Sequence, residues 1–291
     1  MSRMLPLFSG WQKLAGNRRL FVLCFLLFVI SAFFSFWMFF PADVLQRRLI
    51  HEVSQQTGLK MQGRNAAMLF PLGLKLDLSI YPAIPEMTDL ELTELEVTPL
   101  WRRLFSTDRA VNLTANLAGG QLDINAGQSG QINLKCENIA VVSLQKLDMP
   151  YRVSGQLTGQ LDGENISENM TGHGDFALRL NSAQILGLEK IGLPANFSVG
   201  VLRLEGNFDQ RRFSLEKVVL TGGAIELSGG GNILVGETPE QTRLNLNVRL
   251  HPTALTPDSL GNLLNVTGVR PTADGSYLLR IGGTLAKPII R

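Results

Sequence analysis

Two patterns of apolar and polar residues divide the chain. Residues Leu20 to Phe40 are apolar apart from two serines, and no charged residue interrupts them. A helix of about 20 apolar residues crosses a hydrocarbon core of about 30 Å. Proline cannot continue a helix, so Pro41 ends this one where the apolar run ends. The pattern predicts a transmembrane helix over residues 20–41.

Two alternatives compete with a membrane anchor. A cleaved signal peptide has an apolar region of about 7–15 residues followed by small residues, whereas this run ends in the bulky residues Phe36 to Phe40. A buried core helix is rarely so long or so uniformly apolar. The length of the run favours an uncleaved anchor over both alternatives.

The charges beside the run predict its orientation. Four basic residues and no acid precede it, whereas the charges between Asp43 and Glu52 nearly cancel. An excess of Lys and Arg remains on the cytoplasmic side of a membrane. We therefore expect residues 1–19 to form a cytoplasmic tail and everything after Pro41 to be exported.

Residues 42–58 predict a short amphipathic helix. Leu45, Leu49 and Val53 recur at helical spacing, and Gly58 is placed as a C-terminal stop. We expect a connector that packs on the first strands, and the alternative is a helix that docks a partner.

After residue 59 the period changes to two. In the segment PLGLKLDLSIY, the residues Leu72, Leu74, Leu76, Leu78 and Ile80 share one face, and charged or hydroxyl side chains take the other. The next segment, TDLELTELEV, shifts its phase by one residue near Thr93–Glu94. A β-bulge there would restore the common face.

Short alternating segments then follow at intervals of roughly 8–12 residues, which is typical of an all-β meander. The expected turns are Gly119–Gly120, Asp162–Gly163, Asp209–Gln210, Gly222–Gly223 and Gly229–Gly231. Two helical interruptions are expected, a turn in TPLWRRLFS (98–106) and a helix over 256–267 that begins at Thr256–Pro257. The predicted fold is mainly β: one N-terminal transmembrane helix, then a large, curved antiparallel meander with a few short helices over residues 59–291.

Composition narrows the function. The formal net charge is +2, and the four basic residues of the tail leave the exported part close to neutral, so no nucleic-acid partner is expected. Cys24 lies in the apolar run and Cys136 beyond it, which excludes an intramolecular disulfide. The alternation at Ile132, Leu134 and Cys136 predicts that Cys136 is a small core residue.

The sequence contains no group of residues at the spacing expected for a catalytic, cofactor-binding or metal-binding site. The three histidines, His51, His173 and His251, lie far apart and lack Cys or carboxylate partners at ligand spacing. Gly172 to Ala177 fits a G-x-G-x-x-A string, but FALRL reads as a strand where a dinucleotide site needs a helix. We expect no catalytic residue, no cofactor and no metal, with an envelope enzyme as the least favoured class.

Several segments carry a family resemblance. They are the Pro41–Leu45–Leu49 pattern ending at Thr57–Gly58, the PLGLKLDL strand, the turn from Trp101 to Leu104, and GTLAKP at Gly283–Pro288. The chain resembles the N component of bacterial type II secretion systems, in the form that shares its organisation with AsmA-like envelope proteins. The resemblance covers most of the chain. It implies a Gram-negative, single-pass inner-membrane protein with a periplasmic β-domain and brings no catalytic residues.

Two functions follow as expectations. The first is a non-enzymatic secretion component, anchored in the lipid bilayer, whose β-domain contacts other secretion-system proteins or envelope subunits. The second is an AsmA-like protein that binds or transfers phospholipid. A long antiparallel sheet with one apolar face must cover that face, either with its own helices or with an apolar ligand held in a groove.

Overall fold

The computed structural model describes residues 18–38, 41–71, 73–82, 87–100, 109–146, 149–166, 172–236, 238–257, 259–260 and 270–290. Three expected segments lie wholly or mostly outside these residues: the N-terminal tail of residues 1–19, the segment from Trp101 to Phe105, and the helix at 256–267. The chain forms two compact units, Met1–Leu45 and Gln46–Arg291.

The first unit contains helix α2 (Arg18–Met38), which coincides with the apolar run. Its described side chains, among them Phe21, Leu26 and Phe28, are exposed. Within the described residues, none of the helices combines the length and hydropathy of a membrane-spanning segment. The expected span of 20–41 includes residues 39 and 40, which lie outside the described range.

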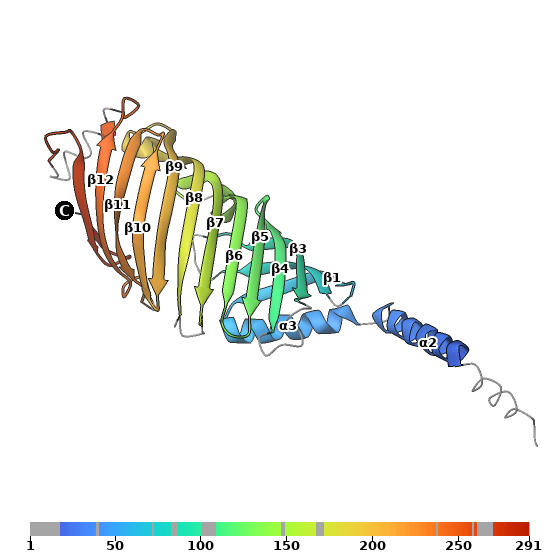
Figure 1. Ribbon diagram of the computed structural model, residues 1–291. Helices are drawn as coiled ribbons and strands as arrows, with labels where there is room; N and C mark the ends of the chain where they lie inside the picture. Colours follow the sequence, from blue (N-terminus) through green and yellow to red (C-terminus); the bar gives the residue numbers. More distant parts are fainter. Residues whose placement is uncertain are drawn as a thin grey trace, which may run out of the picture. The chain divides into compact units, whose positions relative to one another are not determined.

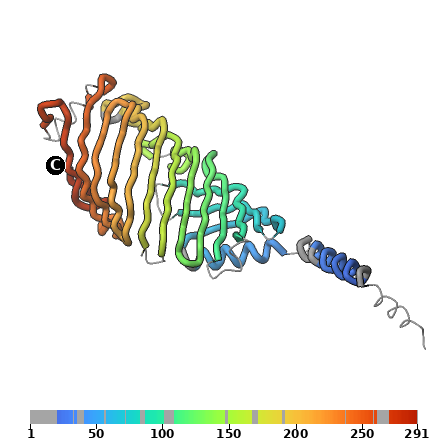
Figure 2. Tube along the Cα trace, viewed as in Figure 1, coloured from blue at the N-terminus to red at the C-terminus, as the bar shows by residue number. Residues whose placement is uncertain are grey.

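The second unit is one antiparallel sheet of 14 strands, in which each strand pairs with its neighbours in sequence. Figure 1 shows the strands fanning round in a twisted and curved sheet, and Figure 2 shows the colours following one another in order across it. The predicted antiparallel β-meander is confirmed. The strands are β1 (Lys60–Leu69), β2 (Gly73–Tyr81), β3 (Leu90–Pro99), β4 (Ala110–Leu117), β5 (Gly120–Gly127), β6 (Ile132–Ala140), β7 (Arg152–Glu164), β8 (His173–Leu186), β9 (Asn196–Asp209), β10 (Arg212–Thr221), β11 (Ile225–Leu234), β12 (Arg243–Pro252), β13 (Tyr277–Gly283) and β14 (Pro288–Ile290). Two 3₁₀ turns, η1 (Val141–Leu144) and η2 (Leu188–Ile191), interrupt the series.

The bulge expected near Thr93–Glu94 is present. Leu76 pairs with Leu95 and Leu78 pairs with Leu92, so β3 holds one more residue than β2 between the two pairs. Glu94 takes up the extra length with a φ of 53°. The bulge returns the apolar residues of β3 to the same face as those of β2, which a one-residue slip would have reversed.

Two of the five expected turns are wrong, and both contain glycine. Asp162 and Gly163 continue β7, paired with Asp175 and Gly174 of β8. The three glycines 229–231 lie inside β11, where a Cβ at Gly229 or Gly231 would collide with backbone carbonyl oxygens of β12. Glycine is used at these positions for close approach between neighbours and not for reversal of the chain. The turns between β4 and β5, between β9 and β10, and between β10 and β11 lie where they were predicted.

Helix α3 (Ala42–Thr57) lies where the connector helix was expected. Gly58 follows it with a φ of 69° and donates its N–H to the Ser54 carbonyl at 3.0 Å. The helix packs on the first strand, as expected. The contacting face is a different one, however, because Gln46 and Ile50 lie against Gly63 of β1 while Leu49 is 41% exposed. Gly63 leaves room for the two larger side chains.

Candidate functional site: an open apolar sheet face

A single row of apolar residues crosses the whole sheet. Cross-strand pairing links one residue of every strand, and none of the 14 is polar. We call these residues the central apolar row: Met68, Leu74, Val97, Leu113, Ile124, Leu134, Leu161, Phe176, Gly206, Leu215, Gly231, Leu246, Ile281 and Ile290.

Parallel rows widen this apolar face. One runs from β4 to β13 and consists of Ala115, Leu122, Cys136, Gly159, Leu178, Leu204, Val218, Gly229, Val248 and Leu279. The next runs from β6 to β13 and consists of Ile139, Leu157, Leu180, Leu202, Leu220, Leu227, Leu250 and Tyr277. The register therefore keeps one face apolar over most of the sheet.

The central apolar row is the least covered of these rows. From Met68 on β1 to Ile281 on β13, the residues of this row are half-buried, except Leu74 and Gly206, which are buried. Buried apolar residues lie instead in the neighbouring rows, such as Ile139, Leu220 and Leu250, or near strand ends, such as Phe197 and Ala224. Neighbouring side chains shield the central row on both sides while its outer surface remains open.

An aromatic patch lies at one end of the face on β8 to β10. The rings of Phe208 and Phe213 stack with centroids 5.6 Å apart, and Phe176 is 6.0 Å from Phe213. Phe208 is cross-strand partner to Gly174, where a Cβ would lie 2.8 Å from its ring. The ring thus covers a strand position that has no side chain, and a side chain there would displace it. Gly163 lies near the same ring, but a Cβ there would first collide with the side chain of Ile166.

The opposite face is polar in the same register. A row of short amide, carboxylate and hydroxyl side chains crosses it from β3 to β12, and it is composed of Thr98, Asn112, Asn125, Asn133, Asp162, Asp175, Asn207, Ser214, Asn232 and Asn245. The two faces are therefore chemically distinct across the sheet, which gives the sheet one side for water and one for apolar contact.

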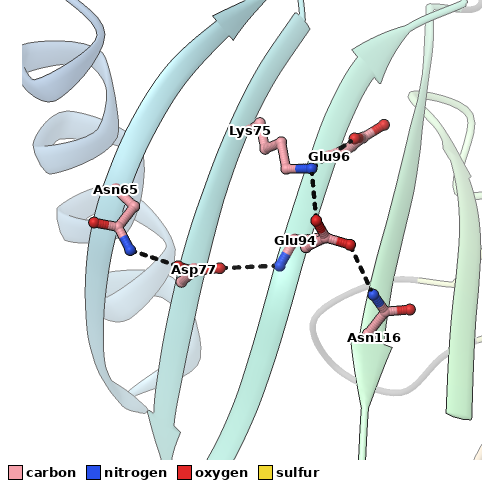
Figure 3. Close-up of polar contacts among 6 residues, drawn as sticks. All are labelled: Asn65, Lys75, Asp77, Glu94, Glu96 and Asn116. Carbon is pink, nitrogen blue, oxygen red and sulfur yellow. Dashed lines mark hydrogen bonds and ion pairs between the residues drawn. The ribbon is translucent and has the colours of Figure 1, made fainter. Parts of the chain in front are cut away.

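A polar network secures the bulges at the β1 end of this polar face (Figure 3). The Asp77 carboxylate accepts the Glu94 N–H at 3.0 Å and the Asn65 side-chain amide at 2.7 Å, and both donor residues have positive φ. Glu94 in turn accepts from Lys75 at 3.0 Å and from Asn116 at 3.1 Å. The hydrogen bonds from the Glu94 N–H and from Asn65 lower the pKa of Asp77. One carboxylate on β2 thus holds the irregular residues of β1 and β3.

The groups that could carry chemistry do not converge in the described part of the chain. Cys136 is buried, as predicted, and burial raises the pKa of its thiol, which keeps it protonated and unreactive. His173 and Glu164 lie 3.7 Å apart on exposed positions. Residues 173–177 belong to β8, so no helix follows the Gly172 string. Among the described residues, no three of His, Cys, Asp and Glu are placed to hold a metal ion.

Comparisons with protein-family models, curated proteins and solved structures find no match for this chain. The functional argument therefore rests on the residues and geometry given above. Sequence periodicity predicted the apolar face, whereas the aromatic patch and the contact between α3 and β1 depend on residues that are distant in sequence.

Proposed function

We propose that this chain is a non-enzymatic, inner-membrane-anchored envelope protein that holds the acyl chains of phospholipid on the central apolar row. The observation that carries the proposal is a row of apolar residues, most of them only half-buried, that crosses every strand of the sheet. Exposed apolar surface of this extent is stabilised when a ligand removes it from water, by about 25 cal/mol for each Å² covered.

The dimensions of the row suit an extended ligand. Neighbouring strands lie about 4.8 Å apart, so 14 strands give a row roughly 60 Å long. One leaflet of a bilayer contributes about 15 Å of hydrocarbon thickness. The face can therefore hold several acyl chains along its length, and it does not require a closed cavity to do so.

The membrane anchor and its orientation are part of the proposal. They are supported by the apolar run Leu20–Phe40 and by the basic residues before it. A helix over the whole of this run would be about 30 Å long, which matches a hydrocarbon core. A phosphatase fused after Gly58 should be active if the sheet is exported to the periplasm, and activity of a cytoplasmic reporter at the same site would reverse the orientation.

Adjacent residues on opposite faces give a matched test of ligand binding. Leu161 belongs to the central apolar row and Gln160 points to the polar face. The full-length protein would be labelled with a photoactivatable fatty acid as the wild type, Leu161→Asp and Gln160→Asp. We expect labelling to fall strongly in Leu161→Asp and to persist in Gln160→Asp.

A second pair of variants controls for local misfolding. Leu215 and Ser214 stand in the same relation on β10, so Leu215→Asp and Ser214→Asp should repeat the contrast. Circular dichroism would confirm that each variant retains its β-structure. Equal labelling of folded variants on the two faces would contradict binding on the apolar face.

The second candidate function is that of a subunit of a type II secretion system. It is favoured by the sequence resemblance, whose segments correspond to α3 with its Gly58 stop, to β2, and to the turn from β13 to β14. In this case the partner is another secretion protein in the periplasm. Neighbouring genes for a secretion ATPase and pseudopilins would support this function, whereas a gene that lies alone among lipid-synthesis genes would oppose it.

A further inference from the structure

A second concave site lies between α3 and β1, away from the central apolar row. It is a pocket of about 410 Å³. Gln46, Arg47 and His51 line it from the helix, and Gly63 and Arg64 line it from the strand. Its lining residues include two arginines and a histidine but no carboxylate. The pocket is therefore electrostatically suited to an anion.

Gln46 gives the pocket a polar floor. The residue is only 7% exposed, and a Cβ on Gly63 would collide with its side-chain amide. The amide therefore lies directly over Gly63, which lines the same pocket. Among the described residues, no hydrogen bond is formed by this amide. Among the described residues, Asn112 Oδ1 is the one fully buried side-chain polar atom without a partner, so the Gln46 amide is not sealed off from the pocket and is accessible to a polar ligand there.

The surrounding elements add donors for an anion. Arg47 follows Gln46 on the helix and already interacts within the protein, but a guanidinium has five N–H donors and keeps donors for phosphate oxygens. Strand β1 is the first strand of the sheet and pairs only with β2, so one edge of its backbone has no strand partner among the described strands. The pocket therefore combines cationic side chains with a neutral amide donor within one small volume.

We propose that this pocket binds a phosphate-bearing anion, with the Arg47 guanidinium and the Gln46 amide as its donors. The identity of the source rests on the proposed membrane anchor, because α3 begins at Ala42, directly after the apolar run. In an anchored chain, Gln46 and Arg47 follow the apolar run by only six and seven residues in sequence, which favours a lipid headgroup as the source. Free phosphate has the same chemistry, and the experiment separates the two sources.

The test uses the full-length chain, purified and delipidated in a neutral detergent. Binding would be titrated with inorganic phosphate, with phosphatidylglycerol and with phosphatidylcholine. Arg47→Ala and Gln46→Leu should each weaken phosphatidylglycerol binding about tenfold, which corresponds to the loss of one charge-assisted or buried hydrogen bond. Arg48→Ala is the matched control, since Arg48 is exposed on the same helix and does not line the pocket.

Each outcome has a defined meaning. Phosphatidylglycerol binding that is sensitive to Arg47 and Gln46 assigns the pocket to a headgroup, and equally sensitive binding of inorganic phosphate assigns it to the free anion. The proposal is overturned if neither anion binds, if phosphatidylcholine binds equally well, or if Arg48→Ala has the same effect as Arg47→Ala.

Two further measurements keep the outcomes distinct. Gln46→Leu should melt at the wild-type temperature without ligand, and a lower melting temperature would instead assign the amide a structural role. Failure of the membrane anchor would appear separately as release of the chain by alkaline carbonate. In that case the titration with inorganic phosphate still decides whether the pocket binds anions.

Discussion

Truncation of Phe208 tests whether the aromatic patch stabilises the sheet. The side chain is 8% exposed, stacks on Phe213 and covers Gly174. Removing a buried phenylalanine side chain costs about 3–5 kcal/mol when the surroundings cannot collapse. Because Gly174 has no side chain that could move into the space, we expect Phe208→Ala to lower the free energy of unfolding by about 3 kcal/mol.

Part of that loss is specific to the ring pair. Stacked aromatic side chains contribute about 0.5–1.5 kcal/mol beyond the area that they bury. A double-mutant cycle of Phe208→Ala and Phe213→Ala should therefore show a coupling energy of about 1 kcal/mol. Phe208→Leu, which keeps apolar volume but loses the ring, should fall between the wild type and Phe208→Ala.

Thermal unfolding followed by circular dichroism would measure these effects. For a domain of this size, a loss of 3 kcal/mol corresponds to a fall in Tm of about 6–12 °C. Tyr151→Ala is the control, because Tyr151 is an exposed aromatic residue and its truncation should change the Tm little. If Phe208→Ala and Tyr151→Ala lower the Tm equally, the ring does not stabilise the sheet by covering glycine and the argument fails.

Three further predictions follow from other sites. Asp77→Asn should lower the free energy of unfolding by about 1 kcal/mol at pH 7. Because folding lowers the pKa of Asp77, the stability that its carboxylate contributes is present above the ordinary pKa near 4 and is lost as the pH falls through the lowered pKa. The difference in unfolding free energy between wild type and variant should therefore be smaller at pH 3. Gly231→Ala should cost about 1–3 kcal/mol, since the φ of 152° and the adjacent backbone of β12 both oppose a side chain, whereas Gly282→Ala, with no atom nearer than 3.9 Å, should be tolerated in the same melting assay. Leu27→Arg should weaken membrane insertion at a cost of about 2.5–3.5 kcal/mol, and adding Val29→Arg should largely prevent it, as measured by carbonate extraction; full retention of the double variant in the membrane would contradict the proposed anchor.

The periodicity of the sequence was sufficient to predict the sheet and its apolar face. The alternation at Leu74, Leu76 and Leu78 predicted which side chains of β2 lie on the apolar face, and the change of phase near Glu94 predicted the position of a bulge. Both predictions depend on residues close in sequence, for which the spacing of side chains along a strand is decisive. The antiparallel order of the strands followed from their short connections.

The errors concern residues whose partners are distant. Gly163 and Gly229 were predicted to be turns, because glycine commonly marks turns, but Gly163 is closely approached by the Ile166 side chain and Gly229 by the backbone of β12. The connector helix was predicted from Leu45, Leu49 and Val53, whereas its contact with β1 is made through Gln46 and Ile50. A local pattern cannot specify which side of a helix will meet a glycine further along the chain. The α3–β1 pocket was missed for the same reason.

The sequential pairing of the strands has a consequence for how the protein can change in length. Each strand packs chiefly on the strands before and after it, so the sheet behaves as a nearly one-dimensional array. Loss or gain of one strand would reverse the direction of all that follow, whereas loss or gain of a whole hairpin would preserve both faces. Each hairpin adds about 10 Å to the width of the sheet. The width of such a sheet can therefore change in evolution by two strands at a time, while one face stays apolar and the other stays polar.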